Sequence, residues 1–327
     1  MGKRDKKKKL KSQDSELATN SKLNKLSKQQ KQLEKVKTSK KLEDDFDIDA
    51  LLAEFKSNNI SGEPVWTLCD APTRRSNSCI LVFSGSNHEL ILFGGELYDG
   101  QSVTMFNSLY RFNIEKCLWS QCTGGISPEP RSGCQIVQIS EVSYMFGGEF
   151  VSPNESTFFH YKDFWMFDLH SSAWSQISTY PQPPPRSGHR MVAYKHLIIL
   201  FGGFYAQGSS MRYYNDLWVF NTHNQKWSLV NVEGGPSKRS GFQFLQYNDS
   251  CLLYGGYTQT TAKNPVGMVF TDLWVLNLNA TSTIISKSNS NEFGSWSWEK
   301  RKKCGGNGPG YYASLIKLKN WLYNSSP

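Results

Sequence analysis

The chain lacks helical periodicity over most of its 327 residues. Between residues 72 and 278, no stretch places apolar residues at the spacing of an amphipathic helix. No apolar stretch approaches the length of a transmembrane span, and no signal peptide is recognisable. These absences argue against a helical bundle and predict a protein of the cytoplasm, the nucleus or both, neither secreted nor in a membrane.

The common motifs of catalysis are also missing. There is no phosphate loop, no Gly-x-Ser-x-Gly turn and no pair of carboxylates on a recognisable framework. None of the histidines shows metal-ligand spacing; they are His88, His160, His170, His189, His196 and His223. The sequence therefore predicts no enzyme, no cofactor and no metal site.

Cysteine pairs of the Cys-x-x-Cys type are absent as well. The seven cysteines are an odd number, and they are Cys69, Cys79, Cys117, Cys122, Cys134, Cys251 and Cys304. Without a secretory signal, this usage favours a reducing compartment. We therefore expect these residues to be buried thiols.

What the chain does contain is a repeat. Four times, an apolar run ends in Phe or Tyr, two glycines follow, and a Trp comes about 25 residues later or more. The glycine pairs are Gly94 and Gly95, Gly147 and Gly148, Gly202 and Gly203, and Gly255 and Gly256; the tryptophans are Trp119, Trp174, Trp227 and Trp298. Spacings of 53, 55 and 53 residues between the pairs are expected of four-stranded propeller blades.

Other landmarks keep their order within each unit. An Arg-Ser-Gly turn recurs at Arg131, Arg186 and Arg239, with a weaker relative at Arg74-Arg75-Ser76. The strand before each glycine pair is almost continuously apolar, as expected of a strand covered on both faces. The predicted fold is all-β. Its predicted parts are blades at about 72–122, 129–178, 184–231 and 237–300, part of a fifth blade at 308–327, and an orphan fourth strand at Val65–Leu68.

The double glycine, the spaced aromatic residue and the Pro-Arg turn resemble kelch repeats. Longer segments, such as Phe146-Gly147-Gly148-Glu149-Phe150 and Tyr213-Tyr214-Asn215-Asp216, resemble the kelch domain-containing protein 4 family. The resemblance implies a six-bladed kelch propeller, spanning about residues 64–327 here, behind a basic tail. It also departs from that family: Gly310 replaces the usual Arg, and the chain stops at Pro327 before a further glycine pair. Either the chain is truncated or its ring does not close by itself.

Charge divides the N-terminal region into two parts. Residues 1–41 hold 15 Lys or Arg and 4 Asp or Glu, whereas residues 42–70 hold 1 and 8. The first part is a low-complexity tail, disordered or helical, that is a nuclear signal, a contact for RNA phosphates or only a solvated tail. It has no aromatic residue for base stacking. Residues 42–60 form an acidic amphipathic helical segment, predicted to pack on the propeller or to dock a partner.

A partner face follows from strand direction. Loops at 96–106, 149–161, 204–214 and 257–270 should leave one face together with the Arg-Ser-Gly turns. The candidate partner-binding residues are Tyr98, Phe158, Phe159, Tyr161, Tyr205, Arg212, Tyr213, Tyr214, Arg131, Arg186 and Arg239. The three arginines either line a positive central mouth or hold neighbouring blades together through carbonyl groups. Tyr213 and Tyr214 are the pair whose replacement is expected to weaken partner capture without unfolding.

Two functions remain open at this point. The first is a non-catalytic scaffold for protein–protein interaction, with a protein partner on the loop-rich face. The alternative is a nuclear or nucleolar ribonucleoprotein-associated factor whose lysine-rich tail contacts RNA.

Overall fold

The computed structural model describes residues 47–57, 62–83, 89–207, 210–260, 266–278, 293 and 296–301. The contacts divide the chain into Met1–Asp47 and Ile48–Pro327, and everything below concerns the second unit. The predicted basic tail and the predicted part of a fifth blade lie outside the described residues. In the parts described, one helix accompanies 25 strands, and no helix is long and apolar enough to cross a membrane.

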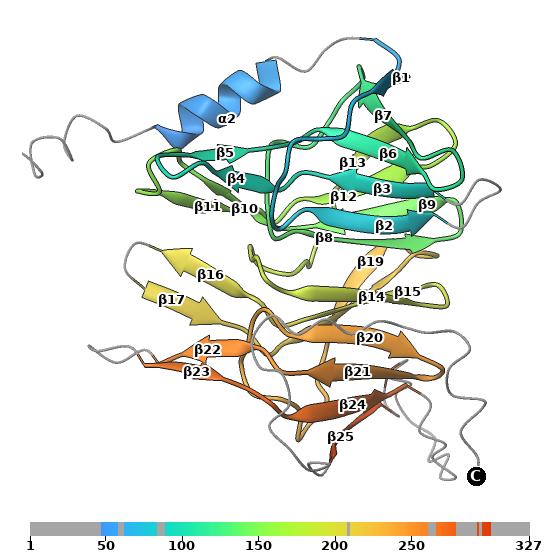
Figure 1. The fold of residues 1–327 in the computed structure, drawn as a ribbon. Coiled ribbons are helices and arrows are strands. Elements are labelled where there is room, and N and C mark those ends of the chain that lie inside the picture. The colour runs from blue at the N-terminus through green and yellow to red at the C-terminus, as the bar shows by residue number, and fades with distance from the viewer. Residues whose placement is uncertain are drawn as a thin grey trace, which may run out of the picture. The chain divides into compact units, whose positions relative to one another are not determined.

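Four large antiparallel sheets form the framework and follow one another along the chain (Figure 1). Each contains four strands in chain order, with a short hairpin between the second and third, and the first sheet has a fifth strand at its edge. Blade 1 has β2 (Cys79–Phe83), β3 (Glu89–Phe93), β6 (Leu109–Asn113) and β7 (Leu118–Thr123). Blade 2 has β8 (Gln135–Ile139), β9 (Val142–Phe146), β12 (Phe164–Asp168) and β13 (Ala173–Ile177). Blade 3 has β14 (Arg190–Tyr194), β15 (Leu197–Phe201), β18 (Leu217–Asn221) and β19 (Lys226–Val230). Blade 4 has β20 (Gln243–Tyr247), β21 (Ser250–Tyr254), β24 (Leu273–Asn277) and β25 (Ser297–Arg301). The predicted all-β kelch propeller fold is confirmed.

The hydrophobic core is divided among the spaces between blades. Each of three buried clusters combines side chains from two consecutive blades. The tryptophan of the fourth strand faces the preceding blade. The ring centroids of Trp174 in blade 2 and Phe93 in blade 1 are 5.2 Å apart, and those of Trp227 in blade 3 and Phe146 in blade 2 are 5.8 Å apart. The repeated Trp therefore joins blades, because a large indole ring fills the space between two twisted sheets.

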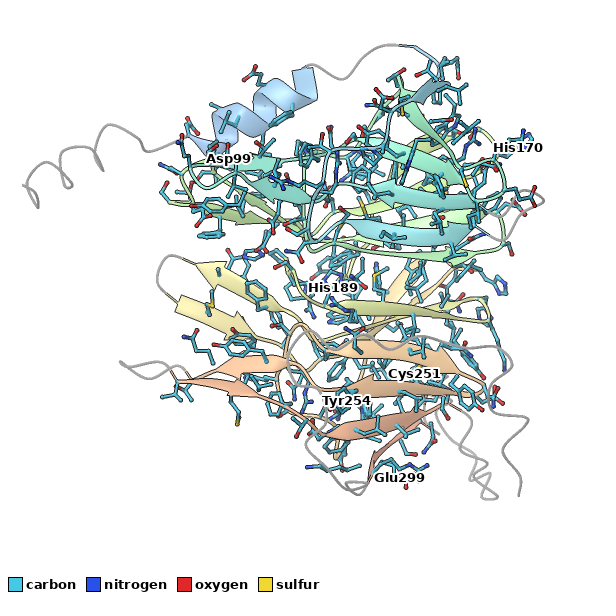
Figure 2. The ribbon with its side chains drawn as sticks, viewed as in Figure 1. Asp99, His170, His189, Cys251, Tyr254 and Glu299 are labelled. Carbon is cyan, nitrogen blue, oxygen red and sulfur yellow. The ribbon has the colours of Figure 1, made fainter. Side chains whose placement is uncertain are left out.

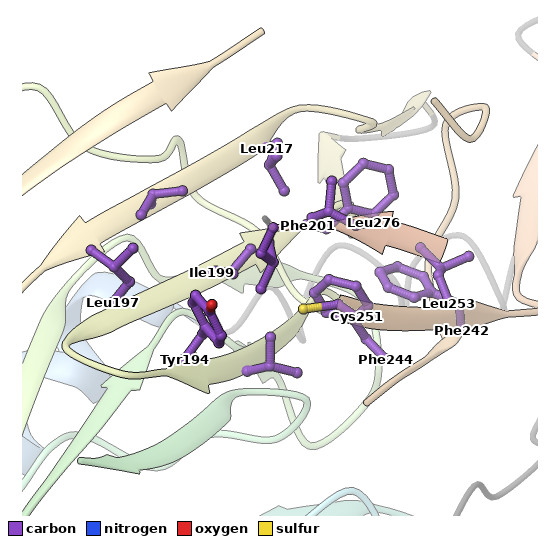
Figure 3. Close-up of a cluster of buried hydrophobic side chains, with 13 residues drawn as sticks. Tyr194, Leu197, Ile199, Phe201, Leu217, Phe242, Phe244, Cys251, Leu253 and Leu276 are labelled. Carbon is purple, nitrogen blue, oxygen red and sulfur yellow. The ribbon is translucent and has the colours of Figure 1, made fainter. Parts of the chain in front are cut away.

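The core between blades 3 and 4 shows this packing at close range (Figure 3). Phe201 of β15 meets Phe242, which precedes β20, with ring centroids 5.6 Å apart. The Cys251 thiol lies among these rings and is fully buried. Strand β15 is buried along its whole length, as predicted for a strand covered on both faces.

The strand predicted at Val65–Leu68 is present as β1 (Val65–Cys69), but its partner was not predicted. It pairs antiparallel with β7 at the outer edge of blade 1, with Val65 opposite Thr123 and Cys69 opposite Trp119. Blade 1 is therefore a five-stranded sheet in the order β1-β7-β6-β3-β2. This pairing supplies the backbone groups of β7 with partners that an edge strand would otherwise leave to solvent.

Candidate partner-binding face

The four segments predicted as loops are β-hairpins, and this is a correction. They are β4 (Glu96–Tyr98) with β5 (Val103–Met105), β10 (Glu149–Val151) with β11 (Phe158–His160), β16 (Phe204–Gln207) with β17 (Ser210–Tyr213), and β22 (Tyr257–Gln259) with β23 (Gly267–Val269). All four extend from the same side of the large sheets (Figure 1). Neighbouring hairpins touch through β5 and β10, β11 and β16, and β17 and β22. We call this continuous layer of four hairpins the hairpin face.

The three arginines of the Arg-Ser-Gly turns lie beneath the hairpin face rather than on it. Arg186 is fully buried, and its guanidinium group donates two hydrogen bonds of 2.7 Å to the carboxylate of Asp216. It also donates to the carbonyl oxygen of Gly202 at 2.9 Å and lies 4.1 Å from the ring centre of Tyr214. A planar guanidinium with five donors suits this combination of carboxylate, carbonyl and ring.

Blades 2 and 4 repeat these contacts. Arg131 donates to Asp163 at 2.6 and 2.8 Å and lies 3.7 Å from the ring centre of Tyr161. Arg239 donates to Asp272 at 2.7 and 3.2 Å and lies against Phe270. Because all three guanidinium groups are buried and hydrogen-bonded, they are not accessible to a partner, and the predicted positive mouth is corrected. These side-chain contacts, carbonyl groups included, lie within each arginine's own blade, so the side chains do not provide the predicted alternative of joining neighbouring blades.

Electrostatics keeps these ion pairs charged. Burial opposes the charged form of Arg131, but the neighbouring Asp163 outweighs burial and raises the pKa of the arginine. Burial likewise acts to raise the pKa of Asp216, yet hydrogen bonding and attraction from Arg186 lower that pKa below its ordinary value. Each carboxylate is therefore ionised at neutral pH.

The backbone of each arginine joins its turn to the preceding blade. Gly203 of blade 3 donates its N–H to the carbonyl oxygen of Arg239 at 2.9 Å, and Arg239 donates its own N–H to Tyr214 at 3.0 Å. This approach explains the glycine pair. A Cβ atom on Gly202 would lie 2.7 Å from the oxygen of Arg239, and Gly202 has a φ of 63°. The same structure occurs at Gly94 and Gly147, next to the oxygens of Arg131 and Arg186.

Three of the predicted tyrosines are also buried. Tyr161 and Tyr214 are the rings beneath Arg131 and Arg186. Tyr213 packs between Phe204 and Tyr257, with ring centroids 6.0 and 6.1 Å away. Burial removes these residues from the accessible surface, so the expectation that Tyr213 and Tyr214 can be replaced without harm to the fold is corrected.

The remaining candidates lie where a partner could reach them. Tyr98 is 59% exposed, Phe158 49% and Phe159 36%, while Arg212 is exposed and Tyr205 is half-buried. Sequence reasoning missed three further exposed apolar residues on this face, Met211, Met268 and Val269. Adjacent residues are exposed together here, as along the whole of β23, so the alternation of a strand gives no signal for them in the sequence.

Carboxylates, rather than arginines, occupy the inner ends of the first two hairpins. Glu96 accepts hydrogen bonds from Asn77 at 2.6 Å and Ser132 at 2.9 Å. Glu149 is largely buried, and burial together with the nearby Glu96 raises its pKa to about 7. Burial lowers the pKa of His160, whose Nε2 lies 3.8 Å from Glu149, to about 4, so this histidine is neutral at pH 7. Glu149 is therefore only partly ionised at neutral pH.

The helix α2 (Ile48–Ser57) lies against the same two hairpins. Leu52 is buried with Phe150 of β10 and Tyr161, and Met105 of β5 packs on this cluster. The ring of Phe55 meets that of Phe150 at 6.2 Å. Of the two predicted roles for the acidic segment, these contacts support packing on the propeller.

No metal centre is found among the residues that the structure describes: they include no group of three His, Cys, Asp or Glu side chains able to hold an ion. His189 is buried between blades against Phe146, with ring centroids 5.7 Å apart, and burial lowers its pKa well below the ordinary value. Figure 2 places His189 inside the molecule, with Asp99 at the hairpin end and His170 at the opposite end of the first two blades.

The fold and the buried arginine turns together define a kelch-repeat propeller. The chain matches the KLHDC2/KLHL20/DRC7 kelch-repeats domain over residues 78–302 and belongs to this family. Kelch repeats generally serve as protein-interaction modules.

Among curated proteins, several relatives align with this chain. Kelch domain-containing protein 3 of Homo sapiens is 26% identical over 212 residues, which cover 61% of this chain and 53% of that protein. The dynein alpha chain of the flagellar outer arm of Chlamydomonas reinhardtii is 30% identical over 159 residues, covering 47% of this chain and 3% of that protein. Tip elongation aberrant protein 3 of Schizosaccharomyces pombe is 27% identical over 227 residues, covering 59% and 19%. The matched parts thus span 53% or less of these relatives.

Among solved structures, that of YjhT superposes with a TM-score of 0.51 at 14% identity, covering 74% of this chain and 69% of that one. At this identity the likeness concerns the fold alone.

Proposed function

We propose that this chain is a non-catalytic scaffold that holds a protein partner on its hairpin face. The observation that carries the proposal is the row of exposed apolar side chains on four adjoining hairpins, including Tyr98, Phe158, Met211 and Met268. Exposed aromatic and methionine side chains are enriched where proteins bind each other. The prominent buried ionisable groups, among them Arg186, already serve the fold, which supports a binding role rather than catalysis.

Charge suggests the chemistry of the partner. Glu96, Asp99 and Glu155 lie on the first two hairpins, whereas Arg212 is the exposed cation on the third. A partner segment with apolar residues and at least one Lys or Arg is complementary to this surface. The cationic side chain would lie towards blades 1 and 2.

The test measures how much partner protein the full-length chain and its variants capture. A variant with Tyr98→Ala, Phe158→Ala and Met211→Ala should capture at least tenfold less partner. Its circular dichroism spectrum and its thermal transition should stay unchanged. Leu118→Ala is the control, because Leu118 is an exposed apolar residue at the start of β7, away from the hairpins. Capture that survives the triple change but fails in the Leu118 variant would place the partner elsewhere.

Finer assignments rest on sequence resemblance. We infer that the chain is a relative of the kelch domain-containing protein 4 family, which its Phe-Gly-Gly-Glu and Tyr-Tyr-Asn-Asp segments support. We also propose that it works in the cytoplasm, the nucleus or both. The 15 basic residues of the tail also support RNA contact as a second candidate function. Salt-sensitive RNA binding that disappears on deletion of residues 1–41 would favour it, and RNA-indifferent capture of a protein partner would favour the scaffold.

A further inference from the structure

Two cysteines from consecutive blades meet in the core. Cys79 begins β2 of blade 1, and Cys134 follows the Arg-Ser-Gly turn of blade 2 directly before β8. Their sulfur atoms are 2.7 Å apart, and the Cys79 thiol also lies 3.0 Å from the carbonyl oxygen of Cys134. Both residues are buried in the cluster between blades 1 and 2. The two thiols thus face each other from positions 55 residues apart in the chain.

We propose that Cys79 and Cys134 are an oxidisable pair that forms a disulfide between blades 1 and 2. The sulfur atoms are already closer than two thiols in ordinary van der Waals contact, and a disulfide bond is about 2.05 Å long. Bond formation therefore asks only for a small movement of the two side chains. No other residue has to be displaced from between the sulfurs.

The chemistry balances with a peroxide as the oxidant. One thiol reacts as its thiolate with hydrogen peroxide, which gives a sulfenic acid and one water molecule. The second thiol then attacks the sulfenic sulfur, the S–S bond forms, and the hydroxyl group leaves as a second water. Two thiol hydrogens and one peroxide thus become two waters. A small thiol such as dithiothreitol reverses the bond by exchange.

The surroundings make this reaction slow. The hydrogen bond with Cys134 and burial both raise the pKa of Cys79, so little thiolate is present at neutral pH. Cys117, by contrast, is exposed in the turn before β7. We expect Cys117 to react first with a soluble oxidant, and the buried pair to follow over a longer time or at higher pH.

The disulfide would join blade 2 to blade 1, whose arginine lacks a carboxylate partner. Blade 1 has Ser108 in place of the carboxylate that blades 2, 3 and 4 provide to their arginines. A disulfide across a 55-residue span also restricts the unfolded chain. The oxidised form should therefore resist unfolding better than the reduced form.

The experiment uses the full-length chain and hydrogen peroxide at pH 7 and pH 9, followed by alkylation and digestion without reductant. We expect a Cys79–Cys134 peptide pair, lighter by two hydrogens, and a thermal transition about 5 °C or more above that of the reduced protein. Dithiothreitol should return the transition to its starting value. Cys134→Ser should abolish both the linked peptide and the shift.

Two controls make the result decisive. Cys251→Ser changes a single buried thiol between blades 3 and 4 and should retain the linked peptide and the shift. If Cys134→Ser does not fold, Cys79→Ala gives the same comparison. Oxidation of Cys117 to completion with Cys79 and Cys134 still free for alkylation after unfolding would overturn the proposal, as would equal linkage of unrelated cysteine pairs.

Discussion

In blades 2, 3 and 4 a buried arginine meets a carboxylate, whereas in blade 1 the equivalent Arg75 meets the hydroxyl group of Ser108 at 2.9 Å. Arg75 still donates to the carbonyl oxygen of Gly94 at 3.1 Å and still covers an aromatic ring, that of Phe106, at 3.9 Å. Without a carboxylate, burial is the main effect on Arg75 and lowers its pKa, whereas the pKa of Arg131 is raised. The ring and the glycine carbonyl therefore suffice for the geometry, and the carboxylate adds strength.

The largest expected effect comes from removing the cation of an ion pair. Arg186→Met leaves Asp216 without its cation in a mostly buried place, and should lower the free energy of unfolding by about 3 kcal/mol. Arg75→Met in blade 1 should lower it by about 1 kcal/mol, because a neutral hydroxyl group is left instead. Urea denaturation of both variants measures the difference, and equal losses would contradict the role given to the carboxylate.

The glycine contact should not distinguish the blades. Gly202→Ala and Gly94→Ala each place a Cβ atom within 2.7 Å of an arginine carbonyl oxygen, at a positive φ. Each should lower the free energy of unfolding by about 2–3 kcal/mol. Gly100→Ala is the control, since Gly100 also has a positive φ but nothing lies within 4 Å, and it should cost about 1 kcal/mol. A clearly milder effect at Gly94 than at Gly202 would show that the backbone contact in blade 1 is weaker too.

The acidic residues after the glycine pairs give a pH-dependent version of the comparison. In the folded chain the pKa of Glu149 is about 7, raised by burial and then by Glu96 from an ordinary value of 4.5. The contribution of Glu149 to the free energy of unfolding is therefore fully present below pH 4.5, and it is lost as the pH rises through 7. Glu149→Gln should flatten this slope and raise the free energy of unfolding at pH 8 by about 2 kcal/mol.

The matched change in blade 1 is Glu96→Gln. It replaces one of the two carboxylate oxygens that accept hydrogen bonds from Asn77 and Ser132. Because Glu96 contributes less than burial to the raised pKa of Glu149, this change should raise stability at pH 8 by clearly less than Glu149→Gln does. Thermal melts from pH 4 to pH 8 measure both variants. A parallel gain from both substitutions would mean that general charge repulsion, rather than the burial of Glu149, sets the slope.

The smallest effect tests whether blade 1 can be given the missing carboxylate. Ser108→Asp should add about 0.5–1 kcal/mol at pH 7, because Arg75 is only half-buried. Paired carboxylates of this kind have lowered pKa values, as at Asp272, so the gain should be present above about pH 4 and disappear on acidification. Arg75→Met combined with Ser108→Asp should lose the gain. Denaturation at pH 7 and pH 3 provides the measurement.

Sequence patterns predicted the fold because the same residue types recur wherever the blades make the same contacts. Gly202 must be glycine because of its backbone conformation and the nearby arginine carbonyl, and Trp227 fills the space between two sheets. The candidate site was less predictable. Tyr213 and Tyr214 have the composition of an exposed binding site, yet Tyr213 at the end of β17 and Tyr214 directly after it are both buried. Whether a residue of a short hairpin is exposed depends on the pairing of its strands and on the side chains packed beneath the hairpin. Neither is visible in the sequence.

The sequence by itself determined the number and order of the blades described, because each unit repeats the glycine pair, the arginine turn and the tryptophan that pack against a neighbouring blade. Only the tertiary structure decided which charges are available. It buries Arg131 against Asp163, leaves Glu96 and Glu149 on the first two hairpins, and brings the sulfurs of Cys79 and Cys134 together. These outcomes depend on contacts between residues that lie 32 to 55 positions apart, and such contacts exist only once the chain has folded.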